Sequence, residues 1–203
     1  MEKPADTQFP IQDSLKRRWS PLAFSSQPID KETLCSLLEA ARWAASSFNE
    51  QPWHFIVATK DNPEEFNRLL SCLAEGNQVW AQHAPVLMLS IAKLYFEKNG
   101  KDNRHAFHDV GAAASLLAIQ ATSLGLFIHQ MAGFDVPKAK ELYNIPERYE
   151  PVAAIAVGYP GDPEALPEQY RQREFSPRQR KPIETFVFTG NWGQTSPVVK
   201  NES

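Results

Sequence analysis

Three separated groups of polar residues in this sequence could carry out chemistry. Basic side chains meet a hydroxyl group in Arg18-Trp19-Ser20, and two arginines alternate in Arg178-Gln179-Arg180. A phosphate monoester carries nearly two negative charges at neutral pH and is bound best by forked guanidinium groups and other strong donors. Each of these two groups is therefore a candidate to bind an anion.

The third group is a run of small polar residues between two regular elements. Ser46, Ser47 and Asn49 follow an apolar helical segment, and Gln51-Pro52-Trp53 leads into a strand-like run. Such a loop can bring backbone N–H groups and side-chain amides to the polar edge of a flat ring. It is a candidate for ligand binding rather than for acid–base chemistry.

Each group also has a simpler structural explanation when it is taken alone. Lysine and arginine are common at the C-terminal end of a helix, where they interact favourably with its dipole. Asparagine, serine and proline are ordinary turn residues, and arginines in a polar segment usually belong to a solvated basic linker. The functional interpretation therefore depends on the three groups occurring together.

Other catalytic and nucleotide-binding signatures are missing. The sequence has no G-x-G-x-x-G after a strand, no G-x-x-x-x-G-K-[ST] and no G-x-S-x-G. His105, His108 and Asp109 could place nitrogen and oxygen ligands near each other on a helix, but without a further good ligand nearby they do not predict a metal site. For His129 we expect a structural hydrogen bond within a strand, and we assign no catalytic acid or base.

Apolar periodicity and helix caps predict the elements that position these groups. Helices are expected over 11–18, after the N-cap Asp30, after Asn62-Pro63, over 105–124 and over 137–143. Short apolar runs predict strands at 54–59, 86–92, 126–131 and 152–159. The helix over 105–124 is rich in small residues, so it should be central and closely packed, and Gly125 should end it. This order indicates an α+β fold rather than a doubly wound nucleotide-binding fold.

Length and composition favour a single soluble domain. The chain has 203 residues, 42% of them hydrophobic, which suffices for one core. A net charge of −3 gives no basic surface for nucleic acid. The longest apolar run, 86–92, is far shorter than the ~20 residues that span a bilayer. We therefore expect a cytoplasmic protein without nucleic-acid or membrane partners. Cys35 and Cys72 lie in apolar-periodic segments, which predicts two buried reduced thiols.

The last part of the chain differs from the rest. Residues 160–182 are rich in proline and charge, and Phe186-Val187-Phe188 resembles a short strand. A tail of this length is poorly suited to cover its own domain as a structureless loop. We expect residues 1–203 to form one domain, with 160–203 as an extended C-terminal arm that reaches the partner subunit.

Taken together, the three groups resemble the nitroreductase family of FMN enzymes. Arg18 to Phe24 resembles the family's opening Arg-x-Ser-x-Arg-x-Phe signature, and Ser46 to Trp53 resembles its Ser-x-x-Asn-x-Gln-Pro-Trp loop, the most specific element. Further likenesses follow in the family's order at residues 77–85, 109–113, 125–135, 178–182 and 192–193. The resemblance implies a three-layer α/β/α sandwich. Its central sheet would be mostly antiparallel, with helices on both faces and a C-terminal arm exchanged between subunits.

The resemblance also implies a homodimer with FMN at the interface. Four residues match positions that hold the phosphate and ribityl chain: Arg18, Ser20, Arg178 and Arg180. Trp19, which lies between the first two, is also expected to contact the cofactor. Ser46, Ser47 and Asn49 match the loop that packs on the flavin from the partner subunit. Asn77 matches a contact to the pyrimidine side of the ring, and Gln130, Met131, Ala132 and Gly133 match the turn that faces its reactive N5 edge.

The implied activity is hydride transfer from NAD(P)H through bound FMN to nitroaromatics, quinones or similar electron-poor acceptors, with ping-pong kinetics. The alternatives are a specialised chemistry of the same family, such as reductive dehalogenation or flavin destruction, and a flavin-storage protein without turnover. Leu22 stands where the family often has a basic residue, so phosphate neutralisation must rely on Arg18, Arg178 and Arg180. Ala45 replaces a frequent proline, and the loop over 94–104 is short compared with members that carry an extra lid helix.

Overall fold

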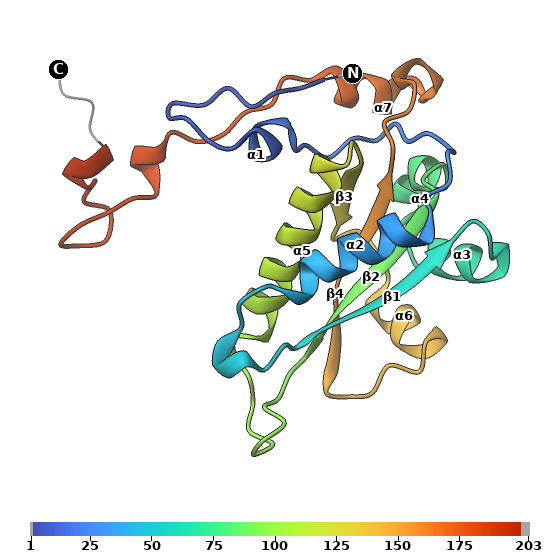
Figure 1. The fold of residues 1–203 in the computed structure, drawn as a ribbon, viewed down its shortest axis with the longest axis horizontal. Helices are drawn as coiled ribbons and strands as arrows, with labels where there is room; N and C mark the ends of the chain where they lie inside the picture. The colour runs from blue at the N-terminus through green and yellow to red at the C-terminus, as the bar shows by residue number, and fades with distance from the viewer. Residues whose placement is uncertain (1, 200–203) are drawn as a thin grey trace.

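One antiparallel sheet forms the centre of the molecule. The computed structural model describes residues 2–199. Its strands are β1 (Trp53–Thr59), β2 (Val86–Lys93), β3 (Phe127–Met131) and β4 (Tyr149–Gly158). They lie in the order β1-β2-β4-β3, and every neighbouring pair is antiparallel (Figure 1). The four strands predicted from apolar runs are confirmed, and β4 begins three residues earlier than expected.

Seven α-helices surround this sheet in the described part of the chain. They are α1 (Asp13–Arg17), α2 (Lys31–Arg42), α3 (Pro63–Leu70), α4 (Glu75–Ala81), α5 (Ala106–Ser123), α6 (Val136–Leu142) and α7 (Glu168–Phe175). Two predicted caps are confirmed, since the side chains of Asp30 and Asn62 accept hydrogen bonds from the N–H groups of Thr33 and Glu65. Gly125 follows α5 with a φ of +77°, a left-handed conformation that glycine adopts without steric cost.

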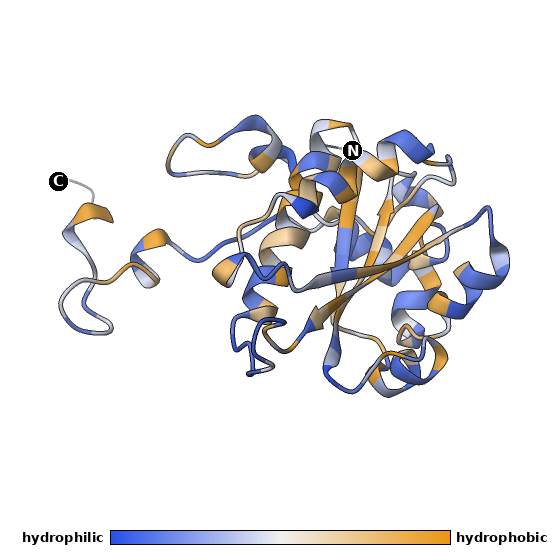
Figure 2. Ribbon diagram, turned by 60° about the horizontal axis from the view of Figure 1, so that its bottom comes forward, coloured by the Kyte–Doolittle hydropathy of each residue, from blue (hydrophilic) through white to orange (hydrophobic). Residues whose placement is uncertain are grey.

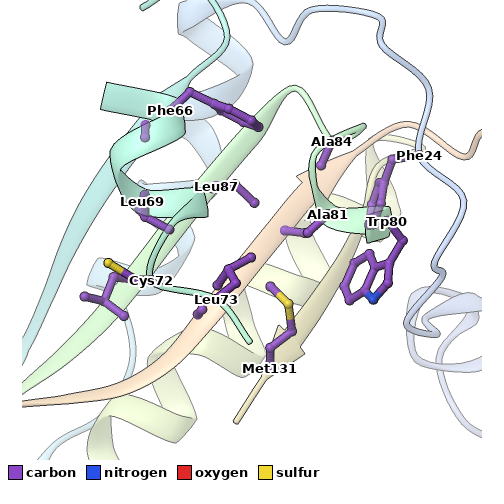
Figure 3. Close-up of a cluster of buried hydrophobic side chains, with 14 of the residues drawn as sticks. Phe24, Phe66, Leu69, Cys72, Leu73, Trp80, Ala81, Ala84, Leu87 and Met131 are labelled. Atoms are coloured by element: carbon purple, nitrogen blue, oxygen red, sulfur yellow. The ribbon is translucent and has the colours of Figure 1, made fainter. Parts of the chain in front are cut away.

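The helices form layers on both faces of the sheet, because side chains alternate between the faces along each strand. On β2, Leu87 and Leu89 belong to a core that contains residues of α3, α4, α6 and α7 (Figure 3). Val86 and Met88 belong to a second core that is shared with α2 and α5. Figure 2 shows the hydrophobic strands enclosed between helices whose outer faces are hydrophilic. The predicted three-layer α/β/α sandwich is confirmed.

Helix α5 is as central as its small residues predict. Ala113, Ala118 and Ala121 are buried in the second core together with Leu117. Small side chains let the helix pack closely against the sheet and against α2. Among the described residues, no helix is both long and apolar enough to cross a membrane.

Four local predictions were incomplete or wrong. The sequence analysis did not predict α4 and α7. Residues 186–188 do not form a strand, and only Phe188 pairs there, through an isolated bridge to Thr195. Cys72 is buried as expected, but Cys35 is exposed, because it lies outside the stripe by which α2 contacts the core.

The chain after α7 leaves the body of the molecule. Figure 1 shows it running beside the N-terminal segment and then projecting away from the sandwich, and the view in Figure 2 agrees. Two of its aromatic side chains, Phe186 and Trp192, are exposed, Trp192 to 93%. Exchange of this arm with a partner subunit stays a prediction.

Candidate functional site

A cavity of about 240 Å³ joins the two basic groups of the sequence. It lies where the end of α1, the strand β3, the helix α7 and the following tail meet. Its lining includes the predicted residues Arg18, Trp19, Ser20, Arg178 and Arg180. It also includes Lys3, Leu22, His129, Arg173 and Glu174. Basic residues from opposite ends of the chain thus lie in one cavity, and binding of an anion there stays a prediction.

Arg18 is one of four arginines that line this cavity. Its guanidinium is half-buried, and burial, helped by the nearby positive charge of Arg180, lowers its pKa. Among residues 2–199, no carboxylate forms an ion pair with Arg18, Arg178 or Arg180. Like charges brought together without a counter-ion raise the free energy of the folded protein, and a bound anion relieves this cost.

Arg178 adds positive charge to the cavity and also binds the backbone around it. One of its terminal nitrogens, Nη1, donates to the carbonyl oxygens of Lys3 (2.5 Å) and Lys16 (3.0 Å). The other, Nη2, donates to the carbonyl oxygen of Arg18 at 2.8 Å. Arg178 therefore fixes the backbone that carries Arg18, and the tail and the start of the chain form one wall of the cavity.

The cavity contains one buried acid, Glu174 at the end of α7. Burial raises the pKa of Glu174, and hydrogen bonds from the N–H groups of Leu22 (2.7 Å) and Ala23 (3.3 Å) act in the opposite direction. The carboxylate thereby holds the segment after Ser20 in place. Leu22 is buried, so the position where the family often has a basic residue supplies no charge to the cavity.

His129 makes the structural hydrogen bond that the sequence analysis expected. Its Nδ1 lies 2.8 Å from the carbonyl oxygen of Pro21, which can only accept, so Nδ1 carries the proton and donates. The imidazole also packs on Trp80, with ring centroids 4.5 Å apart. Burial lowers the pKa of His129, which favours the neutral ring at neutral pH.

The turn after β3 continues from this cavity toward α4. The Nδ2 group of Asn77 donates to the carbonyl oxygen of Gly133 at 2.9 Å, and the N–H of Ala74 donates to the same oxygen. A Cβ atom on Gly133 would lie 2.7 Å from Asn77 Nδ2, so a side chain at this position would displace the Asn77 amide from its hydrogen bond. Gln130 and Ala132 are exposed, whereas the side chain of Met131 is buried in the first core. The structure thus brings the predicted residues Asn77 and Gly133 into contact.

The third group of predicted residues lies elsewhere. Ser46, Ser47 and Asn49 belong to the turn after α2, and Figure 1 places this turn at the opposite end of the sheet from α1 and α7. Phe48, Asn49 and Gln51 have φ values of +53°, +56° and +51°. Such conformations cost about 1 kcal/mol or more for each non-glycine residue, persist only where contacts enforce them, and cluster at ligand-binding sites.

Contacts on the protein side enforce this turn. The N–H of Ser47 donates to the buried carboxylate of Asp109 on α5 (3.0 Å), and the N–H of Gln51 donates to Ser46 Oγ (3.0 Å). The outer side is uncovered, because the Phe48 side chain is 92% exposed. Among residues 2–199, Phe96 packs edge-on against Phe48, with ring centroids 5.8 Å apart, and the outer side of the turn stays largely open to solvent.

A buried ion pair anchors the same loop. Glu50 Oε1 lies 2.6 Å from Lys93 Nζ and accepts the N–H of Glu97 at 2.9 Å, and both paired side chains are 9% exposed. Burial by itself raises the pKa of Glu50, but these hydrogen bonds outweigh it, and the pKa is lower than usual. The stabilisation is therefore present above the unfolded pKa of glutamate and is lost as the pH falls through the lower folded pKa.

We expect Glu50→Ala to lower the free energy of unfolding by about 3 kcal/mol, because the buried charge of Lys93 would keep only the longer contact of 3.4 Å to the exposed Glu97. Adding Lys93→Met should recover part of this loss. The control is Asp102→Ala, which removes the exposed partner of Arg148 and should cost under about 1 kcal/mol. Urea unfolding at pH 7 measures all four proteins; an equal, small effect of both single acid substitutions would contradict the anchoring role.

Sequence reasoning missed four residues of the cavity: Lys3, Arg173, Glu174 and, as a lining residue, His129. Arg173 and Glu174 lie on the unpredicted helix α7. Lys3 lies in a segment without any periodic pattern. Within the described ranges, no cluster of three or more histidine, cysteine, aspartate or glutamate side chains could hold a metal ion.

Comparison with known proteins agrees with this geometry. The family model described as the nitroreductase family matches residues 15–159. An uncharacterised 15.4 kDa protein of Mycolicibacterium smegmatis is 38% identical over 133 residues, which cover 64% of this chain and 86% of that protein. An FMN reductase [NAD(P)H] of Bacillus subtilis is 27% identical, covering 69% of this chain and 61% of that protein. A crystal structure described as an oxidoreductase containing FMN is 35% identical, covers 94% of this chain and 96% of its own, and has a TM-score of 0.88.

The chain belongs to the nitroreductase family. The expectation of an oxidoreductase of this family, reached from the order of its motifs, is confirmed, and so is the expected fold.

Proposed function

We propose that this protein is an FMN-dependent oxidoreductase that takes hydride from NAD(P)H and passes it to nitroaromatics, quinones or similar electron-poor acceptors. The cavity at Arg18 carries the proposal. Its guanidinium groups have no carboxylate partner among the described residues, and Ser20 adds a hydroxyl donor. This donor set fits a phosphate monoester such as that of FMN. The crystal structure with a TM-score of 0.88 is described as containing FMN, which supports the same cofactor.

In this proposal the protein binds, orients and shields, while a bound FMN supplies the hydride-transfer chemistry. Arg18 and Arg180 hold the phosphate, and Arg178 contributes charge while fixing the backbone. Asn77 and the backbone from Gln130 to Gly133 face the ring. Donor and acceptor would then use one open face in turn, which predicts ping-pong kinetics, and solvent would supply the protons that reduction of a quinone or nitro group consumes.

The proposal requires two copies of the chain. The turn with Ser46, Ser47 and Asn49 does not line the cavity, and Figure 1 places it at the opposite end of the sheet. Its rigid outer surface is suited to close the site of a second copy, and exposed apolar side chains on α1 and α5, such as Leu15 and Leu116, offer further surface for that contact. In a homodimer with FMN at the interface, all three groups of residues could contact the same cofactor. A cytoplasmic location also stays a prediction.

Anaerobic titration of the purified protein tests this function. The preparation should be yellow, release FMN on denaturation, and lose its visible absorption when NADH or NADPH is added. A colourless protein that takes up no FMN would reject the cofactor. Bound FMN that neither nucleotide bleaches would favour the alternative of a storage protein, and bleaching without turnover of quinones or nitroaromatics would favour a specialised chemistry of the family.

A further inference from the structure

Leu22 lines the cavity and brings no positive charge to it. The Leu22 side chain is buried, and its N–H is bound to Glu174. Arg178 uses three hydrogen bonds on backbone carbonyl oxygens, so few of its donors are free for an anion. A further cation in the same cavity would therefore strengthen its attraction for a phosphate group.

Lys3 lies in that space. It lines the cavity together with Arg18, Arg178 and Arg180. Its ammonium lies 4.8 Å from the centroid of the Trp19 ring and donates to the carbonyl oxygens of Glu174 and Ser176, each at 2.6 Å. Carbonyl oxygens orient the ammonium without neutralising it, and a lysine has three donors. One N–H and the full charge thus remain for a ligand.

The surrounding backbone holds Lys3 at this place. Its own carbonyl oxygen accepts Arg178 Nη1, and the N–H of Ala5 donates to the carbonyl oxygen of Lys16. The start of the chain is therefore bound to α1 and to the tail, the same elements that carry Arg18 and Arg180. Burial, together with the positive charge of Arg178, lowers the pKa of Lys3, whereas Glu174 raises it.

We propose that Lys3 is a phosphate-binding residue of the flavin site, which supplies from the N-terminal segment the charge that is missing at Leu22. The inference rests on the proposed function, since the ligand is the phosphate of FMN. A purely structural role for Lys3 is the alternative. In that role the ammonium caps the C-terminal end of α7, because it binds carbonyl oxygens that have no partner within the helix. The two explanations differ in what they predict for a flavin without a phosphate.

Binding of FMN and riboflavin to the flavin-free full-length protein separates them, because riboflavin has the same ring and ribityl chain but no phosphate. We expect Lys3→Met to weaken FMN binding about tenfold, since a hydrogen bond to a charged group contributes about 1.5 kcal/mol or more. Its riboflavin affinity should change less than twofold. Lys3→Arg should retain FMN affinity, and Lys98→Met, at an exposed lysine of the loop over 94–104, is the matched control.

Each outcome bears on the proposal. A similar loss of both flavins in Lys3→Met would assign Lys3 to structure alone and overturn it, and so would unchanged FMN affinity. Riboflavin binding reports folding of each variant, so an unfolded protein cannot imitate the expected result. If the unaltered protein binds riboflavin as tightly as FMN, the phosphate assignment of the cavity fails together with this role of Lys3. Failure of the phosphate site as a whole is therefore seen in the unaltered protein, whereas failure of the role of Lys3 alone is seen only in the Lys3 variants.

Discussion

Replacing Arg18 with alanine is expected to weaken FMN binding about a hundredfold, the largest effect of any single side chain in the cavity. A charge-assisted hydrogen bond contributes about 1.5–3 kcal/mol, and a guanidinium can make two of them to one phosphate. Arg18 forms no ion pair within residues 2–199, and Arg178 already holds its backbone, so the side chain is positioned in advance. Little ordering remains to oppose binding.

The neighbouring residue provides the control. Arg17 forms its ion pair with Asp13 at 3.5 Å and does not line this cavity, so Arg17→Ala should change FMN affinity less than twofold. Flavin fluorescence titration measures both variants, with riboflavin as the phosphate-free comparison. The affinity of the unaltered protein should also fall below about pH 6, where a phosphate monoester loses its second charge. Equal FMN affinity of Arg18→Ala and Arg17→Ala would remove the phosphate from this cavity.

The elements that the sequence predicted correctly are those with local signals. The side chains of Asp30 and Asn62 each cap a helix by accepting the N–H of the residue three positions later in the chain. Gly125 follows α5 in the left-handed conformation. Such signals depend on neighbouring residues only, so they can be recognised without a structure. The same spacing places Cys35 outside the stripe of Leu37 and Ala41, and a stricter use of helical periodicity would have predicted its exposure.

The two missed helices lack these signals. Ala74 and Pro167 precede α4 and α7, and neither residue offers a side-chain oxygen as a cap. On α7 the buried side chains are Tyr170 and Glu174, which give no apolar stripe. Packing against the rest of the protein stabilises such a helix, and this packing is invisible to a local pattern. Because α7 was missed, Arg173 and Glu174 were missed as well.

The cavity itself shows why the motifs were informative and still insufficient. Arg18 and Arg178 were paired in the prediction because the family's order of motifs connects them. Lys3 and Glu174 are 171 residues apart, and neither belongs to a motif. Their contact depends on the path of the N-terminal segment across the end of α7, which only the folded backbone determines. The missing charge at Leu22 was visible in the sequence, but the residue that could replace it was not.

Removing residues 182–203 is expected to abolish the dimer and, with it, most FMN binding, while the sandwich stays folded. Every hydrogen bond of residues 182–199 is made within that segment, as between Thr189 and Gln194 or between Ser196 and Val187. Their loss therefore leaves no unpaired group in the body of the molecule. The cut also keeps α7 with Glu174, which fixes Leu22 and Ala23, and both arginines of the tail.

The apolar side chains of the arm provide the reason for its expected role. Phe186, Trp192 and Val198 are exposed, although water is a poor environment for them. A second copy of the chain can bury them, and this burial would stabilise the proposed homodimer. The full-length variant Phe186→Ser/Trp192→Ser should weaken the dimer in the same direction with all backbone present. Light scattering on a sizing column gives the mass, and released FMN gives the loading. A shortened chain that remains a flavin-loaded dimer would show that the body alone forms the interface.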